Sequence, residues 1–202
     1  MVFSFLCSAC APQKYVTVEA QAFSLTNGDL AKYGVAFITP STVTGQEQDI
    51  QSLALSFSNL MKELRPEINI MPLSDTLSMI NRNGMIEDYK KMYRNYSDTG
   101  IFDQDIIRKI SKVTGRRYLA QLKLSEFTQE TSTRFSFGFR IIDTKKARMR
   151  LFFQIWDSHN GTIAWEGSAE LNYSYDTVTN NAINFKTVVQ ITAIELVKNM
   201  PR

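Results

Sequence analysis

The chain has 202 residues, 44% of them hydrophobic and 21% charged, a composition that suits a folded protein with a sizeable core. Its formal net charge of +3 is too small, and its basic residues too dispersed, for a nucleic-acid-binding surface. Both cysteines, Cys7 and Cys10, lie near the N-terminus, so the rest of the chain holds no disulfide framework and no thiolate metal site.

The N-terminus has the order of a secretory signal segment. An apolar run, residues 2–6, leads into the small residues Ser8 and Ala9, and Cys10 follows. This order resembles the lipobox of bacterial lipoproteins, and the resemblance implies that Cys10 carries a lipid. Two alternatives stay open: an unprocessed apolar terminus, and a C-x-x-C redox or zinc pair of Cys7 with Cys10.

Three parts of the chain follow from this interpretation. Residues 1–10 are the expected signal or lipobox remnant. Residues 11–30 are polar and turn-rich, which favours a tether, and residues 31–202 form the folded domain. Beyond the N-terminus no apolar run has the length of a membrane-spanning helix, so attachment to a membrane is expected through the lipid.

The domain opens with a predicted strand, a long helix and a second strand. Residues 33–40 are a short apolar run closed by a proline, and residues 67–72 predict the second strand. Residues 44–66 lie between them and end at Pro66, as helices do. Such a crossover favours a parallel strand pair. The apolar face of this helix consists of Ile50, Leu53, Phe57, Leu60, Met61 and Leu64.

Three shorter helices are predicted between residues 73 and 115. The expected boundary residues are Ser74 or Asp75 with Gly84 for the first helix, and Asp103 with Gly115 for the third. The middle helix carries Tyr89, Tyr93 and Tyr96 on one face. That face is either an aromatic recognition stripe or, as we favour, a packing surface against the body of the domain.

The second half of the domain is antiparallel in character. Alternating apolar residues predict strands at residues 116–127, 134–143, 148–157 and 162–175. The basic run at 143–150 is expected at a solvated hairpin tip, and the polar sequence at 157–161 is expected to form a turn. Trp156 and Trp165 flank that turn; we expect them to pack across the strands, the alternative being an exposed binding patch.

A C-terminal helix completes the predicted domain. Its inward face is expected to carry Ile183, Val188, Ile191 and Ile194. The elements together predict the α/β class, in its α+β form: a mixed sheet with helices packed against it in a single compact domain.

The residues offer no catalytic constellation. His159 is the sole histidine and lies in a turn, so a Ser/His/Asp or Cys/His set has no support. No phosphate-binding loop signature is present, and no cofactor is predicted. The paired carboxylates, Asp103 with Asp105 and Glu87 with Asp88, suit a helix N-terminus and a solvated helix face. They leave a carboxylate enzyme using magnesium or calcium as the weakest hypothesis.

The order of elements resembles a known family of bacterial envelope lipoproteins. The helix–Gly–Tyr–strand junction at 115–118 and the hairpin at 155–166 carry the resemblance, which covers residues 33–200. The family's periplasmic α/β domain occurs in the B-type outer-membrane activator of penicillin-binding proteins and in the curli secretion-channel lipoprotein.

This resemblance implies a non-enzymatic, protein-binding module at the outer membrane, anchored by Cys10 and facing the periplasm. An activator-like module would bind a peptidoglycan synthase. A channel-like module would form a homo-oligomer and insert hairpins. No long inserted hairpin is evident in the sequence, so we expect the activator-like form, with the channel subunit as the alternative.

Overall fold

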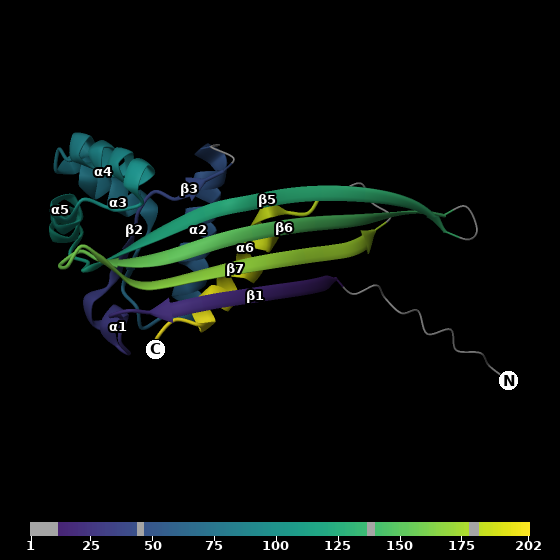
Figure 1. Cartoon of the computed structure of the whole chain (residues 1–202), viewed down its shortest axis with the longest axis horizontal. Coiled ribbons are helices and arrows are strands. Elements are labelled where there is room, and N and C mark those ends of the chain that lie inside the picture. The colour runs from purple at the N-terminus through teal and green to yellow at the C-terminus, as the bar shows by residue number, and fades with distance from the viewer. Residues whose placement is uncertain (1–11, 44–46, 137–139, 178–181) are drawn as a thin grey trace.

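The computed structural model describes residues 12–43, 47–136, 140–177 and 182–202. Its helices are α1 (Asp29–Tyr33), α2 (Glu47–Leu64), α3 (Leu73–Arg82), α4 (Ile86–Thr99), α5 (Gln104–Thr114) and α6 (Phe185–Lys198). Its strands are β1 (Gln13–Ala22), β2 (Val35–Phe37), β3 (Ser41–Thr42), β4 (Ile70–Met71), β5 (Tyr118–Ser136), β6 (Arg140–Asp157) and β7 (Thr162–Thr177). The strands form one sheet in the order β1-β7-β6-β5-β2-β4, and β3 pairs with β5 (Figure 1).

The sheet is mixed, as predicted. β2 runs parallel to both β4 and β5, whereas β5, β6, β7 and β1 are antiparallel neighbours. The predicted strand–helix–strand crossover is therefore confirmed, and so is the α/β class with helices packed on a mixed sheet.

Two hydrophobic cores lie on opposite faces of the sheet. Helices α2 and α6 cover one face along much of its length, and α3, α4 and α5 cover the other face at one end only (Figure 1). On the α2/α6 side, Phe153 lies with its ring centroid 4.6 Å from that of Phe57 and 5.6 Å from that of Trp165. On the other side, Phe102 lies against Trp156 at 4.9 Å.

The structure places part of the predicted tether in the sheet. Residues 13–22 form β1, which pairs antiparallel with β7 over all ten of its residues. Val16 and Val18 are half-buried against the α2/α6 core, while the alternate residues point to the other face. The tether prediction is thus wrong for this stretch, because β7 offers an edge to which a sequence with only a weak apolar alternation can pair.

A long hairpin joins β5 and β6. With 19 residues at about 3.3 Å each, β5 is roughly 60 Å long, and it extends well past the helices (Figure 1). Ser136 pairs with Arg140, so the connection falls within 137–139, outside the described residues. The prediction of a hairpin tip at 143–150 is wrong, because these residues pair with β5 on one side and with β7 on the other for most of their length.

The burial of Lys145 explains why the sequence pattern placed the hairpin tip wrongly at residues 143–150. The lysine side chain is on the α2/α6 face and is buried, with Nζ 3.4 Å from Asp143 Oδ2 and 3.2 Å from Thr131 Oγ1. Together with Ala147 and Met149 it follows the strand period of two. In the sequence alone, this buried lysine could not be distinguished from the exposed basic residues that follow it.

The predicted cross-strand packing of the two tryptophans is wrong. Trp165 pairs with Ile155, and Trp156 pairs with Ile163, because the register shifts between Ile155 and Trp156. Trp165 is buried in the α2/α6 core, and Trp156 is buried in the core beneath α3–α5. Each indole anchors one side of the sheet, and the exposed-patch alternative is excluded because both side chains are buried.

Three of the four predicted helix boundaries agree with the structure. Gly84, with φ +66°, follows the C-cap of α3, as expected of a helix stop. Asp103 caps α5 by accepting from the N–H groups of residues 105 and 106, and Gly115 ends the helix in the left-handed conformation, both as predicted. The start of α3 differs: its N-cap is Pro72, with no side-chain hydrogen bond, where Ser74 or Asp75 was expected.

In α6 the inward face consists of Val188, Val189, Thr192, Ala193, Leu196 and Val197. Of the expected residues, Val188 lies on this face, and Ile191 and Ile194 are half-buried beside it. Ile183 is buried but lies before the helix begins, so its placement on the helix is wrong.

Gly34 is fixed by close backbone packing, which gives a first prediction. Its φ is +67°, and an added Cβ would lie 2.4 Å from Arg116 Cδ and 2.8 Å from the Asn69 carbonyl oxygen. We expect Gly34→Ala to lower the free energy of unfolding by about 2 kcal/mol. Gly28→Ala, at φ +85° with nothing within 4 Å, is the control and should cost about 1 kcal/mol. Equal losses in urea denaturation would contradict this account.

Candidate interaction surface on the antiparallel arm

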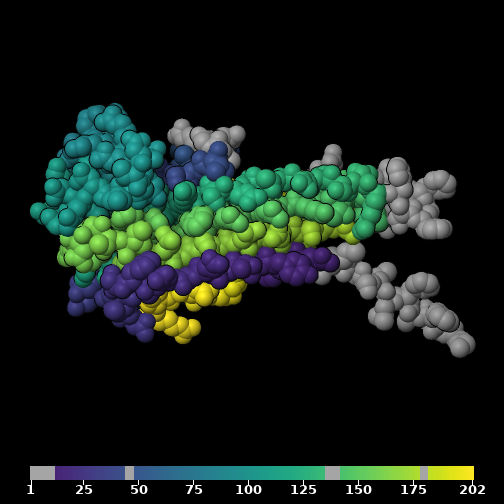
Figure 2. Space-filling model, viewed as in Figure 1, coloured from purple at the N-terminus to yellow at the C-terminus, as the bar shows by residue number. Residues whose placement is uncertain are grey.

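The four strands β1, β7, β6 and β5 form an arm that projects beyond the helices (Figure 2). One face of the arm packs on α2 and α6. We call the other the open face. It carries alternate residues of all four strands, among them Tyr15, Thr17, Glu19, Glu126, Thr128, Arg148, Arg150, Glu170 and Asn172.

Charges on the open face are paired across the strands. Arg150 Nη2 donates to Glu170 Oε2 at 2.6 Å, and Arg148 Nε donates to Asn172 Oδ1 at 3.1 Å. The hydrogen bond from Arg150 holds the pKa of Glu170 below its ordinary value. Glu126 lies 3.8 Å from Arg148 on the neighbouring strand. This face is therefore a ladder of alternating charge that fixes strand register and stays solvated.

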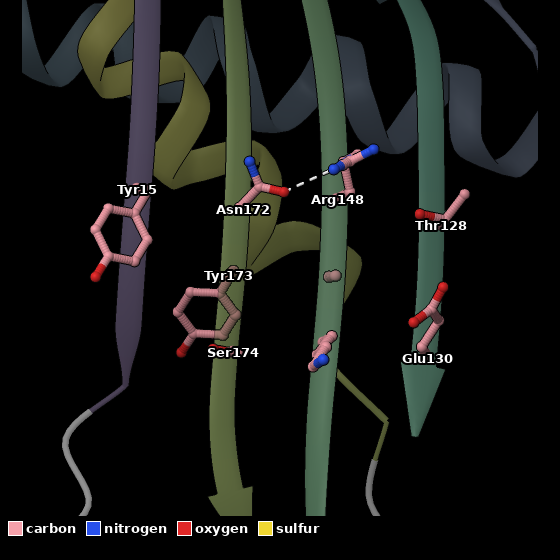
Figure 3. A pocket seen from close by; sticks show the side chains of 9 residues that line it. Tyr15, Thr128, Glu130, Arg148, Asn172, Tyr173 and Ser174 are labelled. Atoms are coloured by element: carbon pink, nitrogen blue, oxygen red, sulfur yellow. Dashed lines mark hydrogen bonds between the residues drawn. The ribbon is translucent and has the colours of Figure 1, made fainter. Parts of the chain in front are cut away.

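A shallow hollow crosses the open face. Tyr15 on β1, Asn172 and Ser174 on β7, Arg148 on β6 and Thr128 on β5 line it (Figure 3). Apart from Ala147, its side chains carry hydroxyl, amide or charged groups, and no hydrogen bond joins a hydroxyl to a general base among them as a catalytic pair would need. The hollow is suited to binding a polar surface.

The arm also has two unpaired edges. Within the part of the chain that the structure describes, no strand pairs with the outer edge of β1 or with the outer edge of β5 beyond Leu124. Side chains from Thr128 to Arg134 are all exposed, and β1 is exposed apart from Val16 and Val18. Each edge presents a row of backbone donors and acceptors to solvent, which makes both edges templates for strand addition.

At the other end of the sheet, Asp157 organises the β6–β7 turn. Its carboxylate accepts two hydrogen bonds from Arg117, at 3.0 and 2.7 Å, and further ones from the His159 N–H and the Asn160 side chain. The His159 carbonyl accepts from Gln104 and Arg108 of α5. The turn predicted at 157–161 is confirmed, whereas no local sequence pattern indicated the ion pair between Asp157 and Arg117, which lie 40 residues apart.

The pKa of Asp157 makes this turn sensitive to acid. Burial raises that pKa, but the hydrogen bonds from Arg117 and from the His159 N–H outweigh burial and hold it below the ordinary value. A carboxyl with a lowered pKa stabilises the fold above its unfolded pKa, and this contribution is lost as pH falls through the folded-state pKa.

We therefore expect Asp157→Asn to lower the free energy of unfolding by about 1–2 kcal/mol at pH 7. The gap between variant and wild type should begin to narrow below about pH 4, where the unfolded-state carboxyl takes up a proton, and should close as pH falls through the lower folded-state pKa. Urea denaturation at pH 7 and pH 3 measures this. Asp105→Asn, at a side chain 84% exposed, is the control and should stay within about 0.5 kcal/mol at both pH values.

The other residues considered for chemistry have structural partners. Asp103 is a helix cap, Asp88 Oδ2 accepts from Lys109 Nζ at 2.7 Å, and Glu87 accepts from Lys90 at 2.9 Å. Across the described residues, no three acidic, histidine or cysteine side chains group as metal ligands would. The carboxylates of the metal-enzyme hypothesis are thus spread over α4 and α5 in separate contacts.

The three tyrosines of α4 are packing residues, as we favoured. Tyr89 Oη accepts from the Thr39 N–H, and Tyr93 Oη donates to the Thr39 carbonyl at 2.7 Å. Tyr96 stacks on Phe102 with ring centroids 4.2 Å apart. Burial raises the pKa of Tyr93 well above its ordinary value. Cys10 lies outside the described residues, so its lipidation stays a prediction.

Comparisons with known proteins bear on the fold. No protein-family model and no curated protein matches the chain. Among solved structures, the PelC dodecamer from Paraburkholderia phytofirmans aligns over 93% of this chain and 99% of its own, with 12% identity and a TM-score of 0.52. The chain is similar to PelC in fold. A dodecamer of a PelC variant from the same organism gives the same TM-score at 13% identity, over 93% of this chain and 100% of its own.

A third structure, lipoprotein GNA1162 from Neisseria meningitidis, aligns over 83% of this chain and 99% of its own, at 14% identity and a TM-score of 0.46. At these identities the likeness concerns the fold. The comparisons thus show structural similarity to PelC and, more weakly, to lipoprotein GNA1162, while the assignment to the activator or to the curli channel lipoprotein stays a prediction. Among the described residues, no helix has the length and apolar character needed to cross a membrane.

Proposed function

We propose that this chain is a non-catalytic lipoprotein of the bacterial cell envelope that binds proteins and works as a homo-oligomer. The observation that carries the proposal is the antiparallel arm, with one open charged face and two outer edges that no strand of the described residues pairs. Exposed edges of this length are a liability in a monomer, and native proteins pair or cover them. The similarity in fold to PelC, whose structure is a dodecamer, supports assembly from identical copies.

The arm changes the balance between the two envelope hypotheses. The activator-like form was preferred because no long hairpin was evident in the sequence, and β5–β6 is such a hairpin. The oligomeric form is therefore the one that we put first. Its further partner is an envelope protein, for which a peptidoglycan synthase is the candidate that the sequence resemblance suggests.

The proposed lipid anchor sets an orientation. Cys10 lies three positions before Gln13, where β1 begins, and three residues of chain span at most about 11 Å. Gln13 lies in the part of the arm that extends away from α3–α5 (Figure 1). A lipid on Cys10 would thus hold the arm towards the outer membrane and leave the helical end facing the periplasm.

Two measurements test this proposal. Light scattering of the full chain purified in detergent should give a mass of several copies, and a strict monomer at micromolar concentration would refute the oligomeric function. Cells fed a palmitate analogue should label the wild type and not Cys10→Ser. Equal labelling of both proteins would refute the lipid anchor on Cys10 and would leave the proposed homo-oligomer unaffected.

A further inference from the structure

The two edges of the arm that no described strand pairs lack proline, the residue that blocks strand pairing most directly. Natural edge strands are blunted by proline or by charges, especially lysine. Residues 13–22 and 125–134 contain no proline and a single lysine, Lys14, and their other charged residues are Glu19, Glu126, Glu130 and Arg134. Both stretches are long, with ten residues in β1 and as many on the outer edge of β5 between Ser125 and Arg134.

The two edge strands, β1 and β5, have opposite chain directions, so the edge of one copy can pair with the edge of the next. Three successive antiparallel pairings, β1–β7, β7–β6 and β6–β5, make β1 run opposite to β5. When two copies stand side by side with their helices on the same side, β1 of one meets β5 of the next antiparallel. We infer that copies of this chain join head to tail in this way, β1 of one copy adding to the free half of β5 in its neighbour. This inference rests on the proposed homo-oligomer and names its interface.

The alternation of side chains restricts the register. Odd positions of β1, such as Tyr15, point to the open face, and so do even positions of β5 beyond the irregularity at 124–126, such as Thr128. Both faces continue across the interface only if an odd position of β1 meets an even position of β5. Two registers pair all ten β1 residues in this way within β5, and the one that we propose runs from Gln13 opposite Arg134 to Ala22 opposite Ser125.

Charge selects this register over the next one. A further shift of two residues would set Glu19 directly opposite Glu130, and like charges facing each other across a ladder are destabilising. In the proposed register Glu19 meets Thr128, and Glu130 meets Thr17.

The stagger also suits a closed assembly. Tyr15 and Thr128 lie in one row within a copy, whereas the proposed pairing sets Tyr15 beside Ser132 of the neighbour. The offset is four residues over four strands, about one residue per strand, which is the stagger of tilted strands in a closed sheet. A two-fold dimer through β1 alone would leave both β5 edges unpaired, while head-to-tail addition leaves none once the ring closes.

Disulfide trapping tests the interface, with Cys7 and Cys10 changed to serine in every variant. Thr17→Cys with Glu130→Cys places one thiol pair on the open face. Lys14→Cys with Thr133→Cys places another on the helix face. In an antiparallel ladder, hydrogen-bonded and non-hydrogen-bonded residue pairs alternate. The two cysteine pairs are three positions apart, so one of them is a non-hydrogen-bonded pair, which has the shorter Cα separation that a disulfide needs.

Within one copy the two positions of each pair lie on strands separated by two others, about 14 Å apart or more, so an internal disulfide is excluded. We therefore expect at least one in-register variant to give a ladder of covalent multimers under mild oxidation. Thr17→Cys with Thr133→Cys, three residues out of register, is the matched control and should stay largely monomeric on a denaturing gel.

The outcomes separate this inference from the proposed function. An oligomer by light scattering that gives no ladder from either in-register variant overturns the β1–β5 interface and leaves the homo-oligomer standing. Dimers from Thr17→Cys alone overturn it in favour of a two-fold β1 contact. A monomer in light scattering overturns both.

Discussion

Replacing Phe153 with alanine is expected to lower the free energy of unfolding by about 3–5 kcal/mol. Phe153 is fully buried and its ring contacts three others: Phe37 on β2, Phe57 on α2 and Trp165 on β7. The cavity would therefore open where the long antiparallel strands meet the parallel strand and the covering helix. Urea denaturation followed by circular dichroism measures the loss.

The adjacent Phe152 is the matched control for this prediction. It lies on the open face, opposite Ser168 of β7, and is half-buried. Phe152→Ala removes the same number of atoms from the same strand, but the site is already in contact with water, so we expect a loss of about 1 kcal/mol or less. Similar losses for the two variants would show that the α2/α6 core is not the main support of the arm.

The fold class was predictable because its strongest signals are local and periodic. Alternation through Tyr118, Ala120, Leu122 and Leu124 gave β5 its inward face, and all four side chains are buried on the α2/α6 side. Asp103 gave the start of α5, where a carboxylate satisfies the free N–H groups of the first turn. Such features depend on neighbours in sequence and do not require knowledge of the sheet.

What the sequence could not supply is strand register and strand length. The faces of Trp156 and Trp165 depend on a one-residue irregularity near the β6–β7 turn, which moves an entire set of side chains to the opposite face. β1 forms because β7 offers it an edge, and its own sequence, with only Val16 and Val18 inward, would not specify a strand alone. The open face of the arm depends on strand register and strand length. The sequence therefore did not predict this surface, although it predicted most of the strands and helices that support it.

Introducing like charges at the proposed interface is expected to dissociate the oligomer. In the inferred register, Thr128→Glu would face Glu19 of the next copy, and Thr133→Lys would face its Lys14. Each like-charge pair costs about 1 kcal/mol. A copy within a ring is held by two interfaces, so its release becomes easier by about 4 kcal/mol, roughly a thousandfold in concentration.

The same two changes leave the isolated copy intact, which makes the prediction specific. Within its own sheet, Thr128 lies opposite Arg148 and Thr133 lies opposite Asp143, so each new charge gains a partner of opposite sign. The variant should therefore keep the wild-type circular dichroism spectrum and a cooperative urea transition while its mass by light scattering falls to that of a monomer. Its urea midpoint should lie below that of the assembled wild type only by the stabilisation that assembly supplies.

Compensating changes on β1 decide whether the register is correct. Glu19→Lys and Lys14→Glu, added to the β5 variant, turn both repulsive pairs into attractive ones and should restore the oligomer. The β1 changes alone set a charge opposite threonine and should have little effect. The four substitutions form two attractive charge pairs only in the proposed register. If the combined variant stays monomeric while the β1 variant and the β5 variant both fold, β1 and β5 do not meet in this register.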